Sequence, residues 1–265
     1  MRVLAYPSWL RPAGSSSAGR VLAAFRRSAY LEFPRTDAVV AVVAPELGRG
    51  PLSLVVEGLP REPLGRGTPA RLSAGRLQVG HLTFELDAAA PWDATLPAAA
   101  PDPTQVRRCC EWLLSCAPRD SLAALVPHLA EGRGPALEAW QQRALAGARA
   151  LAAGDLASGW GLLCGLGPGL TPAGDDFLCG WMLALFVTRR PRPWMPEAAR
   201  STHRIARSYL QAACLGQASE AWHRLVIALE GPHWETAART VVSVGHTSGA
   251  DALAGFLAGL RQLPA

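Results

Sequence analysis

The first hundred residues show the alternation of apolar and polar positions that is typical of β-strands. Two β-branched runs, Ala38–Ala44 and Ser53–Glu57, are bounded by Pro and Gly. Within 71–86 apolar residues recur at every second position, with a shift near Gly80 that indicates a turn or a bulge. We therefore predict a half-buried antiparallel sheet with one or two hairpins in this stretch. The segment 18–31 fits either a helix or a strand with a loop.

After residue 103 the apolar positions change to helical spacing. The preceding segment, 88–103, is rich in Pro and Ala, and we predict a linker or domain edge there. Apolar residues then recur at intervals of three and four, which predicts helices within 137–151, 202–213 and 222–229. The expected fold class is α+β, with a β-rich N-terminal part that holds an antiparallel sheet and an all-helical C-terminal part.

Length and composition are consistent with this division. The chain has 265 residues, of which 49% are hydrophobic and 18% charged, enough for one large domain or two small ones. We predict a β-rich domain at 1–100 and a helical domain at 101–265. The longest apolar run, Phe177–Val187, is too short to span a bilayer, which needs roughly 20 residues. The N-terminus has no continuous apolar stretch of the kind found in signal peptides. We expect a cytoplasmic protein without membrane contact.

The six cysteines form no C-x-x-C pair, so a structural zinc site is not expected and a reduced protein fits best. The net charge of +5 and the pI of about 9.2 are compatible with an anionic partner. The arginines are scattered, however, and no RNA-binding or zinc-finger signature occurs, so we do not expect a nucleic-acid partner.

The chain contains neither lysine nor asparagine, and all 26 basic residues are arginine. The absence of lysine excludes a Schiff-base nucleophile, a pyridoxal-phosphate anchor and the lysine of a phosphate-binding P-loop. The absence of asparagine excludes N-glycosylation and a Cys-His-Asn triad. Codon bias in a GC-rich genome explains the composition, and these chemical exclusions hold whatever its cause.

One stretch, GLGPGLTPAGDD at 165–176, combines glycines, a threonine and two adjacent acids directly before the apolar run. Glycine lets a backbone approach a ligand closely, and acids are favourable at the start of a helix. Backbone N–H groups and a hydroxyl at such a helix start can bind an anion, whereas two carboxylates can instead hold a cation such as Mg²⁺. The alternative is a glycine-rich turn with an Asp N-cap. The ligand-binding candidates are Gly167, Gly169, Thr171 and Gly174, and the possible Mg²⁺ ligands are Asp175 and Asp176.

A second stretch, GHTSGADALAG at 245–255, aligns with 169–180 after a gap of one residue. The aligned pairs are Thr171 with Thr247, Gly174 with Gly249, Asp176 with Asp251, and Gly180 with Gly255. Two loop-to-helix turns of the same design predict two helix N-termini that converge on one site. The alternative is chance similarity in a chain with 26 glycines. The ligand-binding candidates here are Thr247, Ser248 and Gly249.

The catalytic candidates are Asp175, Asp176, Asp251 and His246. His246 lies inside the second motif and suits acid/base chemistry near neutral pH, or it is simply a polar loop residue. Between the two motifs, Ser201 or Thr202 is the expected N-cap of the helix that ends near Gly216. The sequence contains no G-x-S-x-G elbow and no H-E-x-x-H zinc motif.

The two motifs, together with GPLSLVVEG and RLQVGHLTFELDAAAPW in the β-rich part, resemble the AllH-like family. Family members are associated with a subunit of oxamate carbamoyltransferase in bacterial allantoin and purine breakdown. The resemblance implies a reaction of oxalurate with phosphate to give oxamate and carbamoyl phosphate, or the reverse, and it implies two other kinds of subunit as partners. The family tends to have a Thr-Asn pair followed by a Ser between the motifs, where this chain has Thr202-His203 and Ala206.

Three hypotheses follow. The first is a carbamoyltransferase subunit that binds a small anion (carbamoyl phosphate, oxamate or oxalurate) at the paired motifs, where the acids would repel the ligand unless a metal, an Arg or a helix terminus intervenes. The second is a non-catalytic assembly or ligand-sensing subunit whose motif acids cap buried helices. The third is a Mg²⁺-dependent nucleotide or phosphate enzyme, which the missing lysine disfavours. No cofactor beyond a possible Mg²⁺ is expected.

Overall fold

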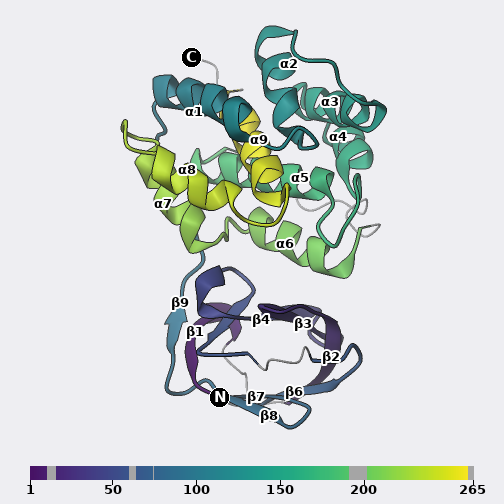
Figure 1. Cartoon of the computed structure of the whole chain (residues 1–265), viewed down its shortest axis with the longest axis vertical. Coiled ribbons are helices and arrows are strands. Elements are labelled where there is room, and N and C mark those ends of the chain that lie inside the picture. The colour runs from purple at the N-terminus through teal and green to yellow at the C-terminus, as the bar shows by residue number, and fades with distance from the viewer. Residues whose placement is uncertain (11–15, 60–63, 74, 191–201, 262–265) are drawn as a thin grey trace. The chain divides into compact units, whose positions relative to one another are not determined.

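The computed structural model describes residues 1–10, 16–59, 64–73, 75–190 and 202–261. The chain divides into two compact units, Met1–Ala94 and Thr95–Ala265, which are treated separately below. The first unit is built of strands and the second of helices, which confirms the expected α+β class (Figure 1). The assignment of independent domains at 1–100 and 101–265 stays a prediction.

The described part of the first unit contains one mostly antiparallel sheet of nine strands. The strand order is β8-β7-β6-β2-β3-β4-β5-β1-β9, and the two parallel pairs are β4 with β5 and β1 with β9. The bounds are β1 Val3–Pro7, β2 Ser17–Ala24, β3 Ser28–Phe33, β4 Ala38–Val43, β5 Ser53–Val56, β6 Pro69–Ser73, β7 Arg76–Val79, β8 Leu82–Glu85 and β9 Ala90–Trp92.

The sheet curls around its own apolar core. Near the start of β1, Arg2 forms a parallel bridge to Glu85 at the end of β8, and the Met1 amino group donates to the Thr83 carbonyl at 2.6 Å. Figure 1 shows the strands of this unit surrounding an interior. The inward side chains include Phe33 and Phe84, both fully buried. The apolar face of the alternating strands therefore packs into a single core.

The predicted strands and hairpins are confirmed. Range 71–86 forms two hairpins from β6, β7 and β8, and Gly80, with a φ of +55°, makes the tight turn between the last two. The undecided segment 18–31 is strand, with β2 and β3 paired antiparallel and a register shift near Val21. That shift interrupts the alternation and is the reason why the pattern there was ambiguous.

The segment 88–103, predicted as a linker or domain edge, contains the boundary between the two compact units at Ala94 and Thr95. It contains β9, which pairs in parallel with β1 at the edge of the sheet. Pro91 is compatible with this place because an edge strand does not need every N–H group for the ladder. Three residues are too few to show a period, so the pattern of apolar positions could not reveal this strand.

The second unit is helical in its described part. Its α-helices are α1 Pro103–Cys116, α2 Leu125–Glu131, α3 Ala139–Ala152, α4 Leu156–Leu163, α5 Ala173–Val187, α6 Arg204–Cys214, α7 Glu220–Ala228, α8 Glu235–Val242 and α9 Ser248–Arg261. The three helices predicted from apolar spacing are confirmed as α3, α6 and α7. All six cysteines are free. Among the helices that the structure describes, none is both long enough and apolar enough to cross a membrane.

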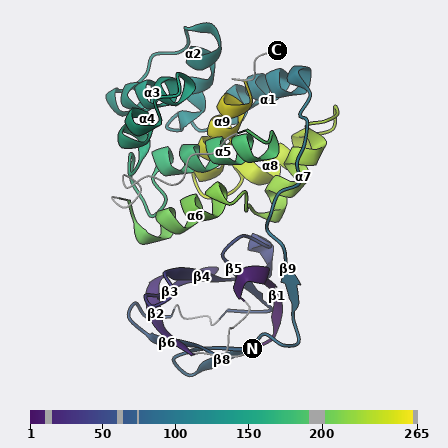
Figure 2. The ribbon, with the colours of Figure 1, turned by 180° about the vertical axis from the view of Figure 1, so that it is seen from behind.

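Helix α5 lies at the centre of this unit and is buried around most of its circumference (Figure 2). Such a helix needs neighbours on every side, and its most extensive partner is α9. The two helices cross with their backbones in direct contact. A Cβ atom at Gly180 would overlap the Ala252 carbonyl oxygen, and one at Gly255 would overlap the Phe177 carbonyl oxygen.

The crossing is reciprocal, because aligned positions of the two motifs occupy aligned places. In the same way, a Cβ atom at Gly174 would overlap the Leu163 carbonyl oxygen at the end of α4, and one at Gly249 would overlap the Val241 carbonyl oxygen in α8. The pairs α4–α5 and α8–α9 are therefore two helix–loop–helix hairpins of like construction. The matched glycines of the two motifs hold each hairpin together and hold the two hairpins against each other.

Replacing either crossing glycine should separate the two central helices. We expect Gly180→Ala and Gly255→Ala each to lower the free energy of unfolding by more than about 2 kcal/mol, because the added methyl overlaps a backbone carbonyl that cannot move alone. Urea unfolding monitored by circular dichroism measures the change. Gly161→Ala in α4 is the matched control, because nothing lies near its Cβ position, and it should change stability by less than about 1 kcal/mol. Equal effects at all three glycines would contradict the close crossing.

Candidate functional site

The two motif loops lie in contact. The Thr171 hydroxyl oxygen, in the loop before α5, is 3.1 Å from the hydroxyl oxygen of Ser248, the first residue of α9. Either hydroxyl can be the donor. The N-termini of α5 and α9 therefore converge, as the repeated motif predicted. Both side chains are partly exposed, so the meeting point is open to solvent.

The first loop owes its path to glycine. Gly167 and Gly169 have φ values of +106° and +98°, a region that other residues avoid. These two turns bring the chain back so that the Gly174 N–H group donates to the Leu166 carbonyl at 2.9 Å. Pro172 follows the loop and is the N-cap residue of α5. No side-chain hydrogen bond caps the helix at this position.

The second loop is closed by the same kind of bond. The Gly249 N–H group donates to the Val244 carbonyl at 3.0 Å, and the Thr247 carbonyl accepts from the Asp251 N–H group at 2.9 Å. The amides of Gly174 and Gly249 are thus used inside their own hairpins, and their lack of a side chain is explained by the packing described above. A ligand-binding role for these glycines stays a prediction.

Asp175 is almost completely buried and anchors two other segments. Its Oδ1 accepts from the Gly165 N–H group at 2.9 Å, and its Oδ2 accepts from the Thr202 hydroxyl. Burial raises the pKa of Asp175, while these hydrogen bonds and the nearby His203 work in the opposite direction. Asp175 therefore joins the loop before α5 to the residues before α6.

Asp251 occupies the aligned helix start on α9 and is fully buried. Its Oδ1 accepts from the Leu122 N–H group at 2.6 Å, so it caps the short 3₁₀ turn Leu122–Ala124 from outside. Burial raises the pKa of Asp251 to about 7, against the effect of the Leu122 N–H and the Thr247 hydroxyl. Its Oδ2 is buried and has no hydrogen-bond partner among the described residues.

Asp176 differs from Asp175 and Asp251 in its partial exposure to solvent. Although the residue is partly exposed, its Oδ2 is buried and lacks a hydrogen-bond partner within the described chain. Burial raises its pKa well above the ordinary range, and the negative charges of Asp251 and Asp175 add to this effect. The hydroxyl groups of Ser248 and Thr171 lower the same pKa. Asp176 thus belongs to the place where the two loops meet.

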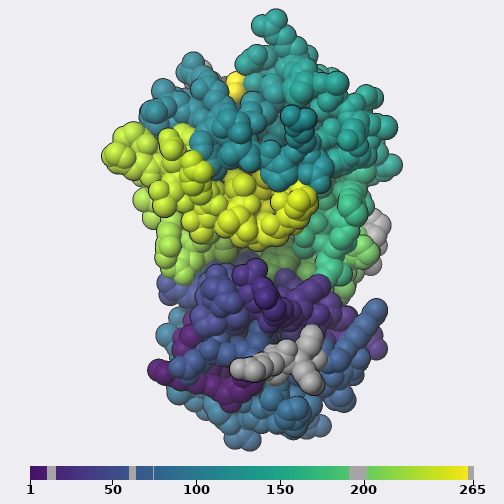
Figure 3. All heavy atoms as spheres, viewed as in Figure 1, coloured from purple at the N-terminus to yellow at the C-terminus, as the bar shows by residue number. Residues whose placement is uncertain are grey.

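His246 is not brought to this place. Its Nε2 lies 3.4 Å from Asp120 Oδ2, and 82% of the side chain is exposed. Figure 3 shows the yellow atoms of this part of the chain at the surface of the helical unit. An acid/base role for His246 therefore has no support from its position and stays a prediction.

The arrangement offers little to a metal ion. Both carboxylate oxygens of Asp175 already accept hydrogen bonds, which leaves Asp176 without a second free carboxylate beside it in the sequence. In the described ranges no group of three or more His, Cys, Asp or Glu side chains is placed to hold a metal. Mg²⁺ at Asp175 and Asp176 stays a prediction that the donor set does not favour.

Sequence reasoning missed two partners of the motif acids. Thr202 was expected as an N-cap, but the N-cap of α6 is His203, and the Thr202 hydroxyl instead donates to Asp175. The other expected cap, Ser201, lies outside the described residues. The Leu122 N–H group, the partner of Asp251, carried no signal at all because a backbone amide has no sequence signature.

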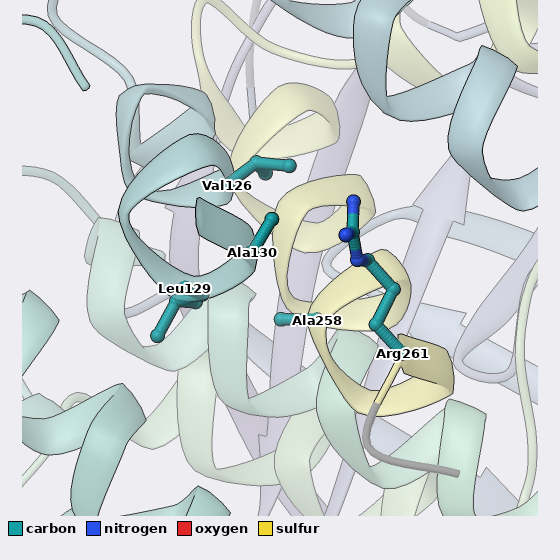
Figure 4. Close-up of a pocket in the computed structure, with 5 residues that line it drawn as sticks. All are labelled: Val126, Leu129, Ala130, Ala258 and Arg261. Carbon is teal, nitrogen blue, oxygen red and sulfur yellow. The ribbon is translucent and has the colours of Figure 1, made fainter. Parts of the chain in front are cut away.

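One pocket lies away from the motifs, between α2 and α9 (Figure 4). Its volume is about 130 Å³, and it is lined by Val126, Leu129, Ala130, Ala258 and Arg261. Arg261 and Ser248 are at opposite ends of α9, roughly 20 Å apart along the helix at its usual rise per residue. The pocket is therefore separate from the meeting point of the loops, and it is smaller than the ~300 Å³ of typical ligand sites.

The raised pKa of Asp251 predicts a pH-dependent contribution to stability. Between its ordinary value of 3.8 and its folded value of about 7, the folded chain holds a proton that the unfolded chain releases. Stability from this group is therefore fully present below the lower value and is lost as the pH rises through the higher one, by an amount on the order of a few kcal/mol.

Asp251→Asn keeps an oxygen for the Leu122 N–H group but cannot ionise. We expect the stability difference between this variant and the parent to shift in favour of the variant as the pH rises from about 4 to about 8. Urea unfolding at several pH values measures the difference. A difference that does not change with pH would show that Asp251 titrates normally.

The chain was compared with solved structures and with models of protein families. No solved structure matches the chain. A family model does match, over residues 163–260, and this range starts at the end of α4 and ends within α9. It thus contains both motif loops, the crossing helices and all three motif acids, while the β-rich unit lies outside it. Over this part of the chain the resemblance is confirmed, and the matching family is oxamate carbamoyltransferase subunit AllH.

Proposed function

We propose that this chain is a subunit of a carbamoyltransferase of the oxamate/oxalurate type and that it binds a small anionic ligand where the two motif loops meet. The reaction converts oxalurate and phosphate to oxamate and carbamoyl phosphate, or runs in reverse. A phosphate oxygen attacks the carbamoyl carbon, the bond from that carbon to the oxamate nitrogen breaks, and this nitrogen takes up a proton. Other subunits of the enzyme are the expected partners.

The observation that carries the proposal is the hydrogen bond between Thr171 and Ser248. It joins two motifs that are far apart in the chain but fall within the same family match. Two helix N-termini with partly exposed hydroxyls form a place where fixed dipoles and O–H donors face a bound anion. Donors held in advance are what an acyl-type transfer needs, because negative charge develops on the carbamoyl oxygen.

A second function is favoured by a specific observation. Asp175 and Asp251 each hold a backbone N–H group of another segment, Gly165 in the first case and Leu122 in the second. This is the behaviour of acids that cap and join buried elements. A non-catalytic subunit that assembles the enzyme or senses a ligand would use these two acids in the same way.

The hydroxyl pair separates the two functions. The double variant Thr171→Val, Ser248→Ala removes both hydroxyls and leaves the buried acids in place. If the site serves carbamoyl transfer, we expect phosphate-dependent formation of oxamate from oxalurate to fall by about 100-fold in the assembled enzyme, as when a fixed oxyanion donor is lost. The assay uses the full chain co-purified with the products of its neighbouring genes.

Thr188→Val is the matched control, because Thr188 lies at the other end of α5 and its hydroxyl donates to the Ala184 carbonyl. It should keep full activity. If the double variant still enters the complex and activity is unchanged, the assembly function stands and the ligand-binding proposal is wrong. Loss of the complex itself would also count against a purely local catalytic role for the hydroxyls.

A further inference from the structure

The pocket between α2 and α9 is formed by one face of each helix. Val126, Leu129 and Ala130 are three and four residues apart on α2, so their side chains lie on the same face. Ala258 and Arg261 are three residues apart on α9 and share a face in the same way. Each face contributes one alanine, whose short side chain leaves part of the space between the helices unfilled.

Arg261 gives this pocket its charge. A side chain in the last turn of a helix points back toward the helix N-terminus. Figure 4 shows the Arg261 side chain running back along α9, with its guanidinium group at the gap between the two helices. The other four lining residues are apolar, and among the described residues no carboxylate forms an ion pair with Arg261. The nearby Cys110 thiol, whose pKa is raised by burial and lowered by Arg261, is only a weak acceptor.

The size and lining of the pocket restrict what it can hold. Benzene fits an apolar cavity of about 150 Å³, so a volume of about 130 Å³ has room for about six non-hydrogen atoms. A guanidinium group pairs with a carboxylate through two parallel hydrogen bonds. The apolar walls favour a hydrocarbon tail, which inorganic phosphate lacks. A small carboxylate with a short tail therefore matches the pocket in size, in charge and in apolar surface.

We propose that this pocket is a binding site for a free short-chain monocarboxylate of about four carbon atoms. The carboxylate pairs with the Arg261 guanidinium, and the hydrocarbon tail lies against Val126, Leu129 and the two alanines. The pocket and Ser248 are at opposite ends of α9, roughly 20 Å apart. One small molecule cannot reach both places, so this ligand is a second molecule and takes no part in the proposed carbamoyl transfer.

Butyrate, butyramide and acetate separate the two parts of the recognition. Butyramide has the shape of butyrate without its charge, and acetate has the charge without most of the tail. Dissociation constants are measured on the full chain by saturation-transfer NMR titration at constant ionic strength. We expect butyrate to bind at least about tenfold more tightly than butyramide, because a hydrogen bond to a charged group is lost. It should also bind about tenfold more tightly than acetate, because less apolar surface is buried. Equal affinities for butyrate and butyramide would overturn the proposal.

Two variants place the ligand in this pocket. Arg261→Gln removes the charge, so butyrate should bind at least about tenfold more weakly while the affinity for butyramide changes by less than about threefold. A merely structural role of Arg261 would weaken both ligands alike. Ala130→Leu fills the space from the α2 side, so binding of both ligands should be lost. Circular dichroism checks the fold, and Arg261→Gln decides by itself if Ala130→Leu does not fold.

The matched controls come from α3. Arg149 is also an exposed arginine in the last turn of its helix, and Ala146 is an exposed alanine, so Arg149→Gln and Ala146→Leu should leave butyrate binding unchanged. Butyrate binding that survives in Arg261→Gln, or that falls equally in Arg149→Gln, would refute the site. The titration is repeated on the assembled enzyme. Binding to the single chain that disappears in the complex would show that another subunit covers the pocket, and would overturn a free carboxylate as its ligand.

Discussion

The helical unit depends on one close contact, the crossing of α5 and α9 at Gly180 and Gly255. Interhelical distance is set by the side chains at the point of contact, and here there are none. The two backbones meet, so the helix starts that lie two turns before the crossing are drawn together as well. The hydrogen bond between Thr171 and Ser248 and the buried acids are consequences of that approach.

The repeated motif explains why so much of this was accessible from the sequence. Glycine, threonine and aspartate recur in the same order, and the aligned glycine pairs occupy equivalent places in the structure. The class of fold and the helices with regular apolar spacing followed from periodicity. Short or interrupted elements did not, and β9 and the pairing of β2 with β3 are examples.

The hydrogen-bond partners of each motif acid could not be predicted from the sequence. Asp175 and Asp176 are neighbours in the sequence with nearly the same surroundings, but consecutive positions on a helix point about 100° apart. One therefore faces the residues before α6 and is fully satisfied, while the other faces α9 and is not. The same geometry made Thr202 a partner of Asp175 instead of a cap, a contact between residues 27 positions apart.

The hydroxyl contact between the loops has a thermodynamic consequence. In the proposed binding site each hairpin contributes one hydroxyl, so neither hairpin would form that site without the other. The proposed site would exist only when the central crossing is formed, and an unfolded or partly opened unit would have no affinity for the ligand. Occupancy and folding are then linked equilibria, in which free ligand at 100 times its Kd adds about 2.7 kcal/mol to the stability of the helical unit. Substrate concentration would thereby help to set how much of this subunit is folded.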